Sequence, residues 1–172
     1  MVGGWSIDLF IGHQSREHSD LEIAVLRDDF SAVRRALAGL RFHTVNNGQT
    51  PLLPDDTEPP GGIAQVRVLD PRAQLWRTEV MLEPGDAMTW RFRYNRAINS
   101  PRADMMRSTP DGIPYLCPQG TLLYKARRPQ PTDQQDFDLA IPHMDPSARA
   151  WLGKAIVTYL GRPQHPWITA LT

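Results

Sequence analysis

The pattern of apolar and polar positions divides the chain into a strand-rich part followed by a helical part. Apolar residues that alternate with polar ones are typical of half-buried strands, and this pattern covers residues 21–26, 41–45, 63–69, 75–83 and 88–94. We expect the last two to pair through a turn at Pro84-Gly85-Asp86. Helical spacing predicts helices over 4–12, 30–40, 119–127, 133–140 and 146–160, and residues 96–114 are expected to be irregular.

The order of these elements predicts an α+β protein. A mixed β-sheet with flanking helices comes first, and the C-terminal third is helical. We therefore expect an α/β core over residues 1–115 and a C-terminal helical region over residues 116–172. Prolines gather between the predicted elements, where they interrupt regular structure, in the stretches 51–60, 110–118, 129–131 and 163–166.

The composition argues against several classes of function. Nineteen Lys and Arg balance nineteen Asp and Glu, so the overall charge favours neither nucleic acid nor an anionic membrane as a partner. No apolar run approaches the roughly 18 residues that a membrane span needs. Cys117 is the single cysteine, so an internal disulfide is excluded. Without a recognisable signal peptide, the sequence predicts a cytoplasmic protein.

Two carboxylates lie one residue apart at the start of the first predicted strand. Asp20 and Glu22 would project from the same face, while Leu21, Ile23 and Val25 point into a core. Neighbouring acids repel each other unless a cation neutralises them. Mg²⁺ is bound by one or two protein carboxylates together with substrate phosphates, so the pair predicts a site for a divalent ion.

The segment around this pair resembles a known signature. Residues 3–22 read Gly-Gly-Trp-x-Ile-Asp-Leu-Phe-x-Gly-x-x-Ser-Arg-x-His-x-Asp-x-Glu. This resembles the antibiotic nucleotidyltransferases of the DNA polymerase beta-like superfamily, and within them the aminoglycoside 2''-adenylyltransferase-like and lincosamide nucleotidyltransferase group. The similarity continues in residues 109–116, 122–126 and 136–137.

The resemblance implies a transferase with a metal cofactor, Mg²⁺ or Mn²⁺. Such an enzyme moves a nucleoside monophosphate, here AMP, from ATP or another NTP to a hydroxyl of a small molecule such as an aminoglycoside. It implies that Asp20, Glu22 and a third acid from a neighbouring strand are catalytic and hold the metal. We choose Glu79, which is in the middle of its predicted strand, over Glu83 at the turn; an exposed strand residue is the alternative interpretation of Glu79.

The resemblance also implies residues that bind the nucleotide. Gly3 and Gly4 would let the backbone approach a triphosphate closely at the start of a helix. Ser15 and Arg16 precede the acids and would contact phosphate oxygens. Arg16 has a structural alternative, which is an ion pair with Asp8.

Three further residues complete the predicted site. Lys125 lies on an otherwise apolar helix, where it either meets phosphate or reaches out to water. Asp136 either holds Lys125 or binds an amine of the acceptor, and we assign it to the acceptor. Asp133 is expected to be a helix N-cap, and His18 to orient its loop rather than to act as a base.

Two other functions remain open at this stage. One is a degenerate homologue that binds nucleotide or a small polar ligand without turnover. The other is a nucleotidyltransferase that modifies proteins or belongs to a toxin–antitoxin pair. Members of the group reach the Gly-Gly pair through a helix and a strand, and here only Met1 and Val2 precede it. We therefore expect an open sheet edge that is covered either by a homodimer or by a longer natural chain.

Overall fold

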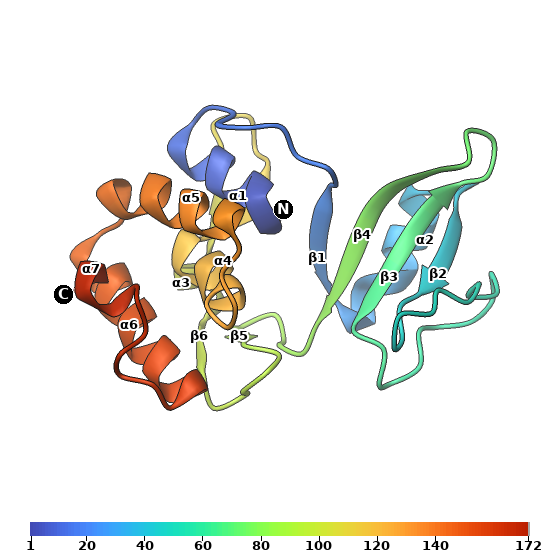
Figure 1. Ribbon diagram of the computed structural model, residues 1–172. Coiled ribbons are helices and arrows are strands. Elements are labelled where there is room, and N and C mark those ends of the chain that lie inside the picture. Colours follow the sequence, from blue (N-terminus) through green and yellow to red (C-terminus); the bar gives the residue numbers. More distant parts are fainter. Residues whose placement is uncertain (172) are drawn as a thin grey trace.

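The computed structural model describes residues 1–171, which form a sheet lobe and a helical lobe (Figure 1). The sheet lobe has a four-stranded sheet in the order β1-β4-β3-β2. β1 runs parallel to β4, and the other pairs are antiparallel, so the predicted α+β fold with a mixed sheet is confirmed. The strands are β1 (Glu22–Leu26), β2 (Arg41–Thr44), β3 (Gln65–Asp70) and β4 (Leu75–Glu83).

One face of this sheet is buried, because its strands alternate apolar and polar residues. Val66, Val68, Val80 and Leu82 point to the same side and pack with Phe30 in one hydrophobic core. Phe30 opens α2 (Phe30–Ala36), which follows the 3-10 turn η1 (Arg27–Asp29). The predicted helix over 30–40 is shorter in the structure, and the backbone turns at Gly39 with a φ of +89°. The other face of the sheet carries polar side chains.

The helical lobe contains α1 and the C-terminal helices. Trp90, Leu122, Leu152 and Ile156 are fully buried in its core, and Ile7 of α1 joins them although it lies at the other end of the chain. The helices are α1 (Gly3–Ile11), α3 (Arg102–Met105), α4 (Pro118–Lys125), α5 (Pro131–Ala140), η2 (Ile141–His143), α6 (Pro146–Leu160) and α7 (Ile168–Leu171). The predicted helices at the start of the chain and in its C-terminal third are thus confirmed.

The two hydrophobic cores do not follow the predicted boundary at residue 115. Residues 88–115 and α1 pack with the C-terminal helices, whereas the sheet core comes from residues 30–82. Two independent domains with that boundary stay a prediction, and Thr172, the last residue of the second one, lies outside the described residues.

The hairpin predicted between 75–83 and 88–94 is wrong. β5 (Thr89–Arg91) pairs instead with β6 (Asn99–Pro101) in a separate sheet. The reason is that Trp90 and Phe92 are both fully buried in the helical core, which draws this segment away from the large sheet. The stretch predicted to be irregular also contains β7 (Met106–Ser108), which pairs with β8 (Pro114–Leu116).

β1 forms one edge of the large sheet. The Val2 N–H donates a hydrogen bond to the Glu22 carbonyl at 3.0 Å, so the segment before α1 occupies part of that edge. A homodimer across it stays a prediction. Within residues 1–171, no helix has the length and apolar character that crossing a bilayer requires.

Candidate active site

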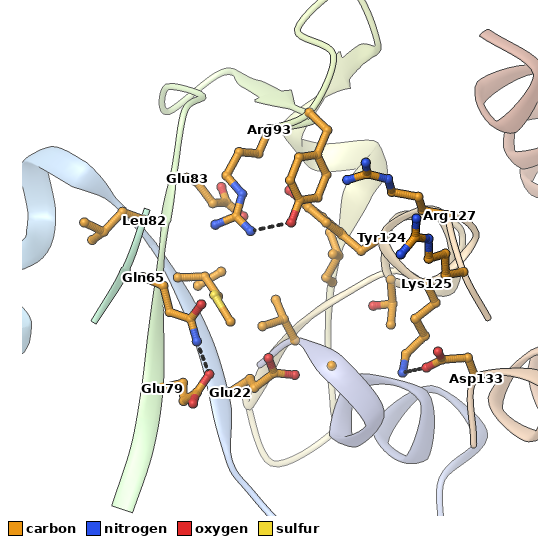
Figure 2. Close-up of a pocket in the computed structure, with 18 residues that line it drawn as sticks. Glu22, Gln65, Glu79, Leu82, Glu83, Arg93, Tyr124, Lys125, Arg127 and Asp133 are labelled. Carbon is orange, nitrogen blue, oxygen red and sulfur yellow. Dashed lines mark hydrogen bonds and ion pairs between the residues drawn. The ribbon is translucent and has the colours of Figure 1, made fainter. Parts of the chain in front are cut away.

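A cavity of about 500 Å³ lies between the polar face of the sheet and the helical lobe. Figure 2 shows Glu22, Glu79 and Glu83 on its sheet side, and Lys125 and Arg127 on its helical side, where Asp133 pairs with Lys125. The sheet contributes Glu22, Ala24, Gln65, Glu79, Met81, Leu82 and Glu83, and the rest of the lining is Val2, Gly3, Arg93, Tyr94, Leu116, Thr121, Tyr124, Lys125, Arg127, Arg128 and Asp133. Of the predicted site residues, Gly3, Glu22, Glu79 and Lys125 therefore line the cavity.

The sheet register brings two of the predicted acids together. Glu22 on β1 lies directly beside Glu79 on β4, and both side chains face the cavity. Asp20 precedes β1 by two residues. Burial raises the pKa of the Glu22 carboxyl, and the negative charges of Asp20 and Glu79 raise it further. Glu22 is therefore a half-buried acid whose negative charge is poorly compensated.

Gly3 is required by its contact with Glu22. It has a φ of +66°, in the left-handed region that favours glycine, and a methyl group on its Cα would overlap the Glu22 carboxylate. A methyl group on Gly4 would overlap the side chains of Arg16 and His18. In this structure the glycine pair is thus explained by close side-chain packing, and only Gly3 lines the cavity.

Glu79 already has positively charged and polar partners. Its Oε1 lies 2.8 Å from the Arg67 Nε in an ion pair, and the Gln65 amide donates a hydrogen bond to its Oε2. The alternative third acid, Glu83, is also paired, with its Oε2 2.8 Å from the Arg102 Nη1. Both acids on β4 are therefore neutralised within the protein.

The opposite side of the cavity carries cations that the sequence analysis missed. Arg127 and Arg128 follow α4, and their side chains make no hydrogen bond or ion pair with any described residue. Arg93 donates to the Ala64 carbonyl at 3.2 Å and to the Tyr94 hydroxyl at 3.0 Å, without an acidic partner in residues 1–171. The sequence signal was the basic run that ends the predicted helix 119–127.

The comparison with known families decides the relationship. Residues 1–97 match the family described as aminoglycoside-2''-adenylyltransferase, and this is more than half of the chain. The chain belongs to this family. A comparison with curated proteins finds no match. The matched segment contains the large sheet with Asp20, Glu22 and Glu79, whereas Lys125, Arg127 and the C-terminal helices lie beyond it.

The family name describes a nucleotidyltransferase that adenylylates aminoglycosides, and the resemblance seen in residues 3–22 is thereby confirmed. A metal ion for such chemistry would need oxygen ligands with uncompensated charge. Glu22 fits this requirement, because it lines the cavity and has no ion-pair partner in residues 1–171. Asp20 has no ion-pair partner there either, but it is exposed and lies outside the cavity lining. Glu79 fits it poorly, because Arg67 neutralises it. Across residues 1–171, no three acidic, histidine or cysteine side chains are grouped closely enough to enclose a metal ion.

In this family member, the loop before Asp20 is held by a buried acid on α1. The Asp8 carboxylate accepts hydrogen bonds from the Ser15 hydroxyl at 2.5 Å and bonds the His18 ring at 2.6 Å. The His18 ring also packs against Trp5, whose indole N–H donates to the Asp20 carbonyl at 3.1 Å. Ser15 thus contacts Asp8 and lies outside the cavity lining, and His18 orients the loop as expected.

Arg16 pairs with Asp136, so the predicted alternative of an Arg16–Asp8 pair is wrong. The Arg16 Nε and Nη2 both donate to the Asp136 carboxylate, at 3.2 Å each. The Asp136 side chain is 1% exposed and also lies 3.0 Å from the Lys125 Nζ. This buried carboxylate joins α5 to α4 and to the loop before β1, and it has no surface left for an acceptor.

Lys125 is bound within the protein more tightly than the sequence suggested. Its Nζ lies 2.6 Å from Asp133 as well as 3.0 Å from Asp136. Burial by itself would lower the pKa of Lys125, but the hydrogen bonds and charges of the two acids outweigh it and raise that pKa. Asp133 is the third residue of α5 and accepts from the Gln130 N–H in a capping box, so the N-cap is Gln130 rather than Asp133.

Proposed function

We propose that the protein is a Mg²⁺-dependent nucleotidyltransferase that transfers AMP from ATP to a hydroxyl of an aminoglycoside-like molecule. The observation that supports this most is the division of charge across one cavity, with Glu22 on the sheet side and Arg127 and Arg128 on the helical side. Nucleotidyl transfer depends mainly on positioning and on charge neutralisation around the phosphates. A cavity with a metal-binding wall and a phosphate-binding wall meets both needs.

Asp20 and Glu22 would hold Mg²⁺ in this proposal, and Mn²⁺ would serve in its place. When bound, the ion neutralises phosphate charge and orients the reacting oxygens. Glu22 is pressed against Gly3, which limits its side-chain freedom. Asp20 is positioned through its carbonyl by Trp5. Both contacts come from α1, which contains Gly3 and Trp5.

Arg127 and Arg128 would bind the triphosphate, because they are the cavity cations without an internal partner in residues 1–171. Lys125 has two carboxylate partners, and we assign it to positioning α4 and α5. Arg93 lies on the same cavity and adds a third positive charge. Arginine suits this task, since its planar guanidinium donates two parallel hydrogen bonds to phosphate oxygens.

The transfer step is an attack of the acceptor hydroxyl oxygen on the α-phosphorus. The new bond joins that oxygen to the α-phosphorus, and the bond from the α-phosphorus to the bridging oxygen breaks to release pyrophosphate. The hydroxyl proton leaves to a carboxylate or to water. Burial raises the pKa of Tyr124 to about 12, so its hydroxyl stays protonated and can donate a hydrogen bond but cannot take this proton.

A second candidate function is nucleotide binding without turnover. The Arg67–Glu79 ion pair favours it, because it neutralises the acid that the family resemblance implied as the third metal ligand. The two functions differ in one observable, which is the release of pyrophosphate in the presence of an acceptor.

The test is a pyrophosphate-release assay with ATP, Mg²⁺ and a panel of hydroxylated aminoglycosides. We expect release that depends on both Mg²⁺ and acceptor. Glu22→Gln should abolish it, and Glu58→Gln, on an exposed loop, should leave it unchanged. ATP binding without release for any acceptor would support the second candidate and contradict the transferase.

A further inference from the structure

We infer that Arg67 takes the place of a second metal ion at Glu79, so that the site binds one divalent cation, at Asp20 and Glu22. This inference rests on the proposed function, because it concerns how many ions the same site takes. It differs from a two-ion arrangement, in which carboxylates bridge ions roughly 3.5–4 Å apart.

Both oxygens of the Glu79 carboxylate are already occupied. Oε1 lies 2.8 Å from the Arg67 Nε, and Oε2 accepts a hydrogen bond from the Gln65 side chain. Arg67 and Glu79 are also register partners on β3 and β4, so the sheet itself places the guanidinium beside the carboxylate. A metal ion at Glu79 would compete with these contacts and would be repelled by the positive charge of Arg67.

Arg67 is held from a second side by an aromatic ring. Its guanidinium lies 4.7 Å from the centre of the Trp76 ring, and the His43 ring packs against the edge of Trp76 with centroids 5.2 Å apart. Arg67 is therefore held between an indole and a carboxylate, although its side chain is 34% exposed.

The neighbouring acid shows the opposite condition. Glu22 lies beside Glu79 in the parallel pair of strands, yet within residues 1–171 it has no ion pair or hydrogen bond from a basic side chain. The positive charge of Lys125 lowers the pKa of Glu22, but burial and the neighbouring acids outweigh it. The protein thus supplies Glu79 with a cation, Arg67, whereas Glu22 is available to bind an ion from solution.

The experiment counts Mn²⁺ ions bound to the full chain by electron paramagnetic resonance, with a non-hydrolysable ATP analogue present. We expect one ion in the wild-type protein and two in Arg67→Ala, because the freed Glu79 then becomes a ligand. Arg67→Gln is a second variant of similar length, and Arg67→Lys should keep the count at one. The matched control is Arg77→Ala, which removes an ion pair of 2.7 Å with Asp70 between the same two strands and should also leave one ion.

Two ions in the wild-type protein would overturn the inference, and so would a single ion in both Arg67→Ala and Arg67→Gln. Either result would leave the proposed metal-dependent transferase in place. No bound Mn²⁺ in any of the proteins would instead overturn the proposed function together with the inference. Circular dichroism establishes that each variant is folded before the ions are counted.

Discussion

The two walls of the cavity position their charges in different ways. On the sheet wall, Glu22 and Glu79 are placed by strand register, so their separation follows from the hydrogen-bond ladder between β1 and β4. On the helical wall, Arg127 and Arg128 follow the end of α4, and their place depends on how that helix packs in the second core. The family match includes the sheet wall and stops before the helical one. We therefore propose metal binding for the part that matches the family and phosphate binding for the part beyond the match.

The buried Asp136 and the half-buried Glu22 differ in whether the protein supplies them with cations. Asp136 on the helical side is 1% exposed and is neutralised by Arg16 and Lys125. Glu22 on the sheet side lies between two acids that raise its pKa. The chain thus supplies two cations to Asp136, which supports the fold, and, within residues 1–171, none to Glu22, which we propose as a metal ligand.

The largest effect should follow from removing the charge of a proposed metal ligand beside the cavity. We expect Asp20→Asn to lower turnover by at least about 10³-fold, as when a main transition-state stabiliser is lost. The free energy of unfolding should change by less than about 0.5 kcal/mol, because Asp20 is exposed. Steady-state kinetics with Asp56→Asn as a control measures this, and turnover within tenfold of wild type would place the metal elsewhere.

The next largest effect concerns stability on the helical side. Asp136→Ala leaves Arg16 and Lys125 without their shared buried partner. We expect the free energy of unfolding to fall by about 3–5 kcal/mol in urea titrations. Asp138→Ala, on the same helix but exposed, should cost less than about 0.5 kcal/mol. Equal losses for the two variants would remove the structural role assigned to Asp136.

A smaller effect is expected for the phosphate-binding wall. Replacing both Arg127 and Arg128 by Ala should weaken ATP binding by about 10–100-fold, which corresponds to roughly 1.4–2.8 kcal/mol. The loss should shrink as salt rises, because exposed charges are screened. Fluorescence titration with ATP measures the affinity, and the control is the double variant of two exposed arginines, Arg96→Ala and Arg162→Ala, which should bind ATP as the wild type does. Unchanged affinity would return the phosphate-binding role to Lys125.

The smallest effect is a pH-dependent gain in stability without metal. The pKa of Glu22 is raised in the folded protein above the ordinary 4.5, so its protonated form is favoured there. Wild-type stability is therefore lost as pH rises through the folded-state pKa. In chelator at pH 7, Glu22→Gln should melt at a higher temperature than wild type, and the difference should disappear below pH 4.5. A lower melting temperature for Glu22→Gln at pH 7 would show that Glu22 stabilises the fold.

The sequence predicted those parts of the site that depend on local periodicity. Asp20 and Glu22 were predicted as a pair because alternation in a strand is a local rule. Glu79 was chosen because the family resemblance implied a third acid from a neighbouring strand and Glu79 lies in the middle of one. The partner of Glu79 could not be found this way, since Arg67 reaches it only through the pairing of β3 with β4. Residues 88–94 were assigned to the wrong sheet for a similar reason. Their alternation correctly predicted a strand, but because Trp90 is buried in the helical core, this strand pairs with β6 and not with β4.

The central claim is that metal and nucleotide bind together, one on each wall of the cavity. Isothermal titration of ATP into the wild-type protein, with Mg²⁺ and then with chelator, tests it most directly. We predict saturable binding with Mg²⁺ and at least about tenfold weaker binding in chelator, a difference of about 1.4 kcal/mol. Glu22→Gln should bind ATP equally weakly under both conditions. ATP binding by the wild-type protein that is the same in Mg²⁺ and in chelator, or absent from both, would contradict the account.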